Sequence, residues 1–194
     1  MAIEHNIITD PDLHEPKGIA SANSRNIYIA DGAGSGIWQP IAMGSVWQDA
    51  RSSPIVITGS GAGAVRVSDI LTGGAAGNGL IEVQANSDSS LQYTGTLARH
   101  FHIAATLSAQ RSSGASAECT ASIQHYDDSA GTWSTIPHSY VVFEILATPT
   151  STAMHADIMM STNDKLAVAV HNTGGGSDVS LVTNYLFMMG MPGV

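Results

Sequence analysis

Cysteine is almost absent from this sequence. Cys119 is the only one among 194 residues, so no disulfide can form within a single chain. No spacing of Cys and His residues typical of a zinc finger occurs either, which argues against a structural zinc site. A compact region of more than about 100 residues can bury a hydrophobic core of its own. We therefore expect the chain to fold by hydrophobic packing, without a cross-link or a structural metal.

Positive charge is also scarce. The sequence has 7 Lys and Arg residues against 16 Asp and Glu residues, which gives a formal net charge of −9 at pH 7. The basic residues stand one at a time rather than in clusters: Lys17, Arg25, Arg51, Arg66, Arg99, Arg111 and Lys165. Because nucleic acid repels an acidic chain that lacks a basic patch, we expect no nucleic-acid partner.

Long hydrophobic runs are missing as well. Apolar runs such as residues 141–143 and 186–189 are far too short to cross a bilayer. Residues 1–5 lack the basic and then apolar order of a secretory signal peptide. We expect no membrane partner, and we expect the protein to be made and assembled in the cytoplasm of the producing cell.

Up to residue 78 the sequence contains short apolar bursts separated by glycine. Glycine-rich stretches at residues 31–36, 59–63 and 73–79 indicate tight turns or extended linkers. Helical periodicity is missing, apart from one weak candidate turn at residues 45–51. We predict that residues 1–78 form an extended, glycine-rich attachment segment or small β region with short strands.

From residue 79 onward the pattern changes to long strands with alternating polarity. In residues 99–107 four apolar side chains share one face: Phe101, Ile103, Ala105 and Leu107. Residues 117–125 repeat this pattern, and further strands are expected at residues 139–147, 153–161, 165–172 and 178–189. Strands at this spacing with no helix between them predict an all-β fold, with an antiparallel β-sandwich of the jelly-roll type over residues 79–194.

The last two predicted strands are apolar on both faces. Only one face of a strand meets the core of an antiparallel sandwich, so the second face needs another cover. A neighbouring subunit is the simplest cover. The predicted subunit interface comprises Leu166, Val168, Val170, Val182, Tyr185, Leu186, Phe187 and Met188.

Two histidines are the main candidates for metal binding. His100 and His102 lie at i and i+2, on the same face of one strand, where both could reach one metal or ring an axis between subunits. The alternative is an exposed or interface polar face. Because the neighbouring sequence offers no carboxylate to complete the ligand set, we expect no metal, although the sequence leaves a site at an axis open.

Catalytic and cofactor motifs are not found. The glycine strings at residues 32–36 and 59–63 lack the Lys-Ser/Thr ending and the following helix of a phosphate loop. No Gly-x-Ser-x-Gly elbow occurs, and nothing pairs the acidic residues of the sandwich as a glycosidase requires. We therefore expect no enzyme and no cofactor.

Aromatic residues offer one further possibility. Trp38, Trp47, Tyr126, Trp133 and Tyr140 could stack on carbohydrate. The alternative, which we favour, is ordinary packing, with Trp133 capping its hairpin and Trp38 anchoring the N-terminal segment.

Residues 10–20, with the string Leu-His-Glu-Pro-Lys-Gly, and residues 26–38 together resemble a stretch near the start of tailed-phage structural proteins. The resemblance covers about an eighth of the chain. It implies a virion component whose N-terminal segment docks on the particle. The attachment residues would be Leu13, His14, Glu15, Pro16, Lys17, Tyr28 and Trp38.

Residues 79–194 are similar in layout to the jelly rolls of tumour necrosis factor and of the complement globular heads. The matching features are the strand at residues 99–103, the start of a strand at residues 163–168, and a closing strand that ends at residues 185–187. The similarity implies a tight homotrimer. That family often has Gly before Asp at the start of the second of these strands, whereas this chain has Asn163.

Taken together, these features predict a trimeric capsid decoration or head-fibre protein, anchored on the virion through its N-terminal segment. Its partners would be two further copies of the chain and capsid or other virion proteins. The alternative is a tail or baseplate adhesin that recognises a host surface glycan or protein.

Overall fold

The computed structural model describes residues 22–30, 36–49, 55–57, 65–66, 76–112, 117–173 and 178–191. The predicted attachment residues Leu13, His14, Glu15, Pro16 and Lys17 lie outside these ranges. The chain divides into two compact units, Met1–Ile41 and Ala42–Gly193. This division differs from the boundary at residues 78 and 79 that the sequence suggested.

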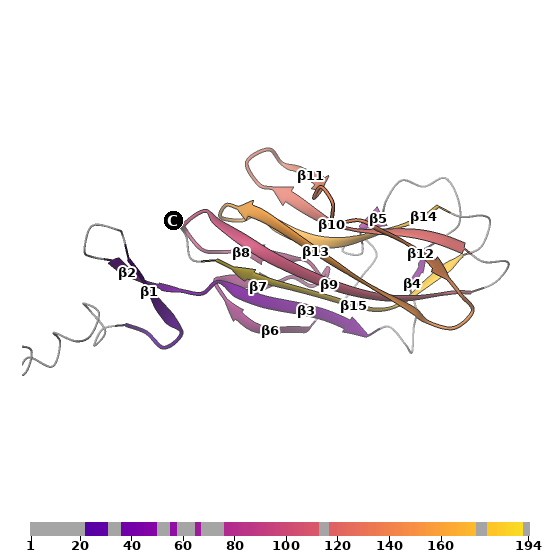
Figure 1. The fold of residues 1–194 in the computed structure, drawn as a ribbon, viewed down its shortest axis with the longest axis horizontal. Coiled ribbons are helices and arrows are strands. Elements are labelled where there is room, and N and C mark those ends of the chain that lie inside the picture. Colours follow the sequence, from indigo (N-terminus) through magenta and orange to yellow (C-terminus); the bar gives the residue numbers. More distant parts are fainter. Residues whose placement is uncertain are drawn as a thin grey trace, which may run out of the picture. The chain divides into compact units, whose positions relative to one another are not determined.

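The first unit contains one antiparallel hairpin (Figure 1). Its strands are β1 (Asn26–Ala30) and β2 (Gly36–Pro40), and Tyr28 stands opposite Trp38 in their register. The two rings lie 5.4 Å apart, centroid to centroid, at a tilt of 58°. Two of the predicted attachment residues are therefore in contact with each other.

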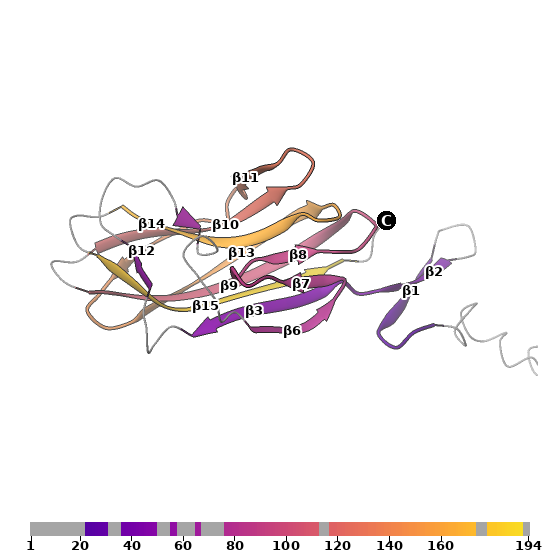
Figure 2. The ribbon, with the colours of Figure 1, turned by 180° about the vertical axis from the view of Figure 1, so that it is seen from behind.

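The second unit is a sandwich of two antiparallel sheets (Figures 1 and 2). The seven-stranded sheet has the order β11-β10-β14-β8-β7, with β12 also paired to β10 and β5 to β14. Its strands are β5 (Val65–Arg66), β7 (Val83–Ala85), β8 (Leu91–Tyr93), β10 (Ala117–Asp127), β11 (Thr132–Thr135), β12 (Val141–Ile145) and β14 (Lys165–Asn172).

The six-stranded sheet has the order β13-β9-β15-β3-β6, with β4 also paired to β15. Its strands are β3 (Met43–Asp49), β4 (Ile55–Ile57), β6 (Ala76–Ile81), β9 (Arg99–Arg111), β13 (Thr150–Met160) and β15 (Val179–Gly190). All strand pairs are antiparallel, and the described residues contain no helix. The residues that the structure describes therefore include no helix that is long and apolar enough to cross a membrane. The predicted all-β antiparallel sandwich is confirmed.

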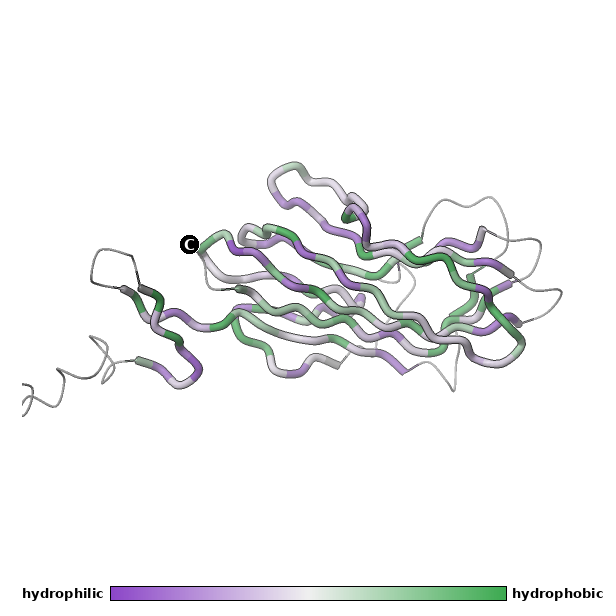
Figure 3. The backbone as a smooth tube through the Cα atoms, viewed as in Figure 1, coloured by the Kyte–Doolittle hydropathy of each residue, from purple (hydrophilic) through white to green (hydrophobic). Residues whose placement is uncertain are grey.

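The core lies between the two sheets. Phe101, Ile103, Ala105 and Leu107 are buried on β9, as the alternation predicted, and Cys119, Ala121 and Ile123 are buried on β10. Figure 3 shows green, hydrophobic residues recurring along the strands of both sheets, with paler or purple residues between them. This period of two follows from the pleat, which turns successive side chains to opposite faces.

Strand β3 was not expected in the sandwich. The sequence pattern placed residues 43–49 in the attachment segment, with a weak candidate helical turn at residues 45–51. In the structure β3 pairs with β15 from Thr183↔Asp49 to Met189↔Met43, and Val46 is fully buried. Burying Val46 requires a partner strand about 140 residues away in the sequence, and a local pattern cannot reveal such a partner.

Strand β15 and the turn before β14 each contain a local irregularity of the backbone. A bulge lies between Leu181 and Thr183, where β15 changes register against β9. Asn163 has a φ of 72°, in the left-handed region that glycine adopts without strain. Asn tolerates this region better than most other residues, which explains how it replaces the glycine expected from the jelly-roll resemblance.

Candidate functional site

The structure separates the predicted interface residues of β15 into two groups. Leu186 and Met188 are fully buried against the chain's own core, and Val182 beside the bulge is also buried. Tyr185 is 39% exposed, and Phe187 is partly exposed on the same outward side. After the bulge, only the odd-numbered residues of β15 therefore face outward, where they are accessible to a neighbouring subunit.

The predicted interface residues of β14 all face inward. Leu166, Val168 and Val170 are buried in the core, opposite Leu91, Ile123 and Ala121 in register. The other face of β14 carries Ala167 and Ala169, and both are also buried. Arg66, opposite Ala169 on β5, reaches across β14 and β10 to Trp133 on β11, so long side chains of the same sheet cover these alanines.

A contiguous apolar surface does exist, on the outside of the six-stranded sheet. Tyr185 stands opposite Trp47, and Met189 stands opposite Met43, with Phe187 between them on β15. Trp47 is 45% exposed and Met189 is 40% exposed. Adjacent large apolar side chains on one flat face are typical of an interaction surface. We call these five residues the outer apolar face: Met43, Trp47, Tyr185, Phe187 and Met189.

A polar cluster borders the outer apolar face on strands β9 and β13. His102 stands opposite Met189 of β15 on one side and Asp157 of β13 on the other. His102 Nδ1 lies 2.9 Å from Asp157 Oδ1, and the His102 and His155 rings are stacked with centroids 5.8 Å apart. Within the described residues, no three His, Cys, Asp or Glu side chains are close enough together to hold a metal ion.

The outer face of the seven-stranded sheet has a different character. Tyr126 and Trp133 are opposite in register, with ring centroids 5.3 Å apart. The Lys165 ammonium lies 5.2 Å from the Tyr126 ring centre, and the Arg66 guanidinium lies 4.5 Å from that of Trp133. The aromatic residues singled out in the sandwich thus do not form one surface, since Trp47 is on the other sheet.

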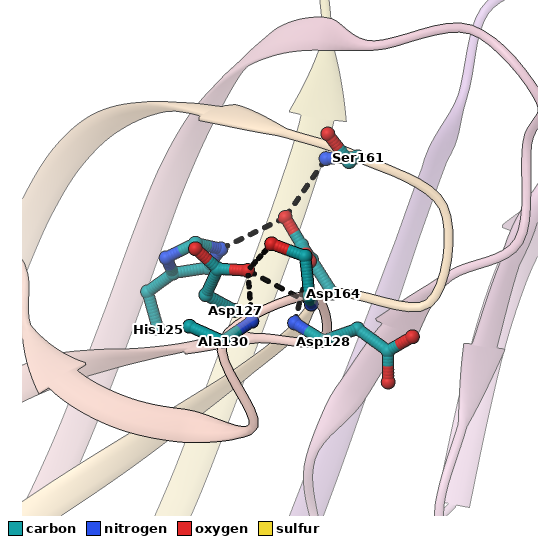
Figure 4. A network of polar contacts seen from close by, with 7 residues as sticks. His125, Asp127, Asp128, Ala130, Ser161 and Asp164 are labelled. Carbon is teal, nitrogen blue, oxygen red and sulfur yellow. Dashed lines mark hydrogen bonds and ion pairs between the residues drawn. The ribbon is translucent and has the colours of Figure 1, made fainter.

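A buried polar network joins two turns at one end of the sandwich (Figure 4). Asp164, which is 4% exposed, accepts hydrogen bonds from the backbone N–H groups of Ser161 and Asp128, at 2.8 and 3.0 Å. Its Oδ2 atom also lies 3.1 Å from His125 Nε2. At the adjacent turn Asp127 accepts bonds from Ser129 and Ala130, which hold the pKa of its carboxyl below the usual range. All of these contacts fix turns, which indicates a structural role.

Cys119 is not a reactive thiol. Its side chain is fully buried opposite Phe143 in the seven-stranded sheet. Burial raises its pKa to about 11, and the nearby Glu118 carboxylate acts in the same direction. A thiol is a nucleophile only as its thiolate, so this residue is inert in the folded chain.

Comparison with known proteins bears on the fold. No protein-family model matches the chain, and no curated protein is significantly similar to it. Among solved structures, the Eiger TNF of S. frugiperda superposes with a TM-score of 0.53 at 11% identity, over 80% of this chain and 96% of that one. Murine APRIL gives a TM-score of 0.46 at 8% identity, over 76% of this chain and 99% of that one. The likeness to the Eiger domain establishes that this chain has a jelly-roll fold of the TNF kind.

Proposed function

We propose that this chain is a non-enzymatic, homotrimeric structural protein of a tailed-phage particle, of the capsid decoration or head-fibre type. The observation that carries the proposal is the outer apolar face on the six-stranded sheet. It gathers five large apolar side chains on the solvent side of a sandwich that already has a complete core of its own.

Assembly through this face follows from its composition. Aromatic and methionine side chains are enriched at protein interfaces, and their burial against a second copy removes apolar surface from water. Three copies arranged around an axis would cover all three faces at once, because each copy meets a neighbour on either side. The TNF-like fold supports this arrangement, and the resemblance of residues 79–194 to the trimeric jelly rolls points the same way.

Attachment to the particle rests on the N-terminal unit. Residues 10–20 and 26–38 carry the resemblance to phage structural proteins, and the β1–β2 hairpin belongs to a unit distinct from the sandwich. A lone two-stranded hairpin has little stability in water. Ile37 is 55% exposed, and the Tyr28 and Trp38 pair is only partly buried, so the hairpin would gain stability by docking on a protein of the virion.

Two measurements test the proposal. Light scattering on the purified chain should give the mass of three copies. Deletion of residues 1–41, which removes the first unit and leaves β3 in place, should keep the trimer and abolish retention on DNA-filled, tailless heads. A stable monomer at micromolar concentration would overturn the trimer, and undiminished retention of the deleted chain would overturn the attachment role.

The aromatic and cationic outer face of the seven-stranded sheet favours a second candidate, an adhesin of the tail or baseplate. In a trimer sealed through the six-stranded sheets this face stays in water, where Trp133 and Tyr126 could stack on a host glycan. Binding of the isolated sandwich to a glycan array or to host cells, lost in Trp133→Ala, would support the adhesin. Retention on tailless heads would instead support decoration.

A further inference from the structure

Three of the eight histidines of the chain lie on the outer side of the six-stranded sheet. His100 and His102 come from β9, and His155 comes from the neighbouring strand β13. The sequence showed only the first two and offered no carboxylate near them. The structure adds a carboxylate and a third histidine, because the register of β9 and β13 places Asp157 opposite His102 and His155 opposite Ala104.

Asp157 orients the His102 ring. A carboxylate can only accept a hydrogen bond, so His102 Nδ1–H donates one to Asp157 Oδ1. In the neutral ring the lone pair then belongs to Nε2. Histidines that bind metals usually have this arrangement, with the second ring nitrogen bonded to a carboxylate that orients the ring. The hydrogen bond to Asp157 is therefore the one that a metal-binding His102 would need.

His155 supplies a second imidazole beside the first. The two rings are stacked at an interplanar angle of 25°, with centroids 5.8 Å apart, on adjacent strands of one face. The side chains of His102 and Asp157 are 41% and 64% exposed, and a polar contact so exposed to water contributes little to folding. Folding stability therefore does not explain why these three side chains lie together, whereas the binding of a ligand would explain it.

We infer that His102 and His155 form half of a transition-metal site that a second copy of the chain completes. This inference rests on the proposed assembly through the outer apolar face. His102 stands opposite Met189, which belongs to that face, so a copy that covers Met189 also approaches the two imidazoles. Since one copy brings no three such ligands together within its described residues, the remaining ligands come from the neighbour.

The ligand chemistry selects a class of metal. Neutral imidazole suits divalent zinc, nickel and copper, whereas magnesium and calcium prefer oxygen ligands. A cation between copies would also reduce the repulsion between chains that each carry a net charge of −9. Asp157 acts here as a positioning residue, because it orients His102 through a hydrogen bond.

Zinc chloride, titrated by calorimetry into the EDTA-treated full-length protein, tests the inference. We expect at most one zinc per chain, with affinity reduced at least tenfold in His102→Ala and in His155→Ala. Asp157→Asn should weaken binding by about 10- to 100-fold, as expected for a partner that orients a ligand. The matched control is His171→Ala on the outer face of the other sheet, which should bind as the unaltered protein does.

Light scattering with and without EDTA separates this inference from the proposed function. A monomer under both conditions overturns the trimer itself. A trimer whose zinc affinity is the same in His155→Ala as in His171→Ala keeps the proposed function and overturns the metal site. A monomeric variant such as Phe187→Asp that still binds zinc as tightly as the trimer overturns the sharing between copies.

Discussion

The outer faces of the two sheets differ although their strands alternate in the same way. On the six-stranded sheet the outward positions of β3 and β15 carry large apolar side chains in adjacent rows. On the seven-stranded sheet the rings of Tyr126 and Trp133 each have a cation close to them, and Gln124 Nε2 donates a 2.6 Å hydrogen bond to Thr135. The first face is the one that we propose another copy covers, and the second is the one that we propose remains in water.

The largest effect is expected from a carboxylate introduced into the outer apolar face. In Phe187→Asp, three copies would each bury an unpaired charge at the interface, which costs several kcal/mol. We expect the trimer to dissociate at least about a thousandfold more readily, because each 1.4 kcal/mol is a factor of ten. Analytical ultracentrifugation over a dilution series measures this. The matched control is Val142→Asp, since Val142 is 57% exposed on the seven-stranded sheet, and it should remain trimeric.

The contrast between the two sides of β15 can be sharpened with neighbouring residues. Leu186→Ala removes a fully buried side chain and should lower the free energy of unfolding by about 3 kcal/mol. Met189→Ala, on the outward side, should lower it by less than about 1 kcal/mol. Urea denaturation of both in the monomeric Phe187→Asp background keeps assembly out of the comparison. Equal losses would mean that the inward and outward sides of β15 have been assigned wrongly.

The turn network allows a test at the end of the sandwich, away from both faces. Asp164→Ala leaves the N–H groups of Ser161 and Asp128 and the ring of His125 without their acceptor, which should cost about 2 kcal/mol of stability. Asp128→Ala removes an exposed carboxylate of the same turn and should change the free energy of unfolding by less than about 0.5 kcal/mol. A thermal melt of each variant gives the answer. A melting temperature unchanged in Asp164→Ala would contradict the structural role.

The smallest effect is expected on the face that remains in water. Lys165→Ala removes a cation that lies 5.2 Å from the ring centre of Tyr126, and such partly exposed contacts contribute about 0.5–1 kcal/mol. Lys165→Arg keeps the charge and should retain most of that stability. Chemical denaturation measures both, and neither change should alter the mass of the assembly. Dissociation in Lys165→Ala would reverse the roles given to the two faces.

The alternation of residues was enough to predict the sandwich, but not which side of the last strand is free. Leu181 and Leu186 both face the core although one has an odd number and the other an even one, because the bulge between Leu181 and Thr183 shifts the period. Strand β14 looked apolar on both faces for another reason. The outward residues in its middle, Ala167 and Ala169, are alanines, which the long side chain of Arg66 crosses.

The remaining features depend on contacts between distant parts of the sequence. Trp47 and Met43 join the outer apolar face only because β3 pairs with β15. The glycine-rich stretches on either side of β3 made its sequence look like part of an extended segment. Asp157 comes next to His102 from 55 residues away. By contrast, the break at residues 162–164 between two expected strands was found from the sequence, because Asn and Asp are typical turn residues and leave a local trace.

The location of Cys119 also has a consequence for assembly. The sole sulfhydryl of the chain is buried, so folded copies cannot form a disulfide with one another. The proposed trimer would rely on non-covalent contacts alone. Its stability should therefore be the same under reducing and oxidising conditions.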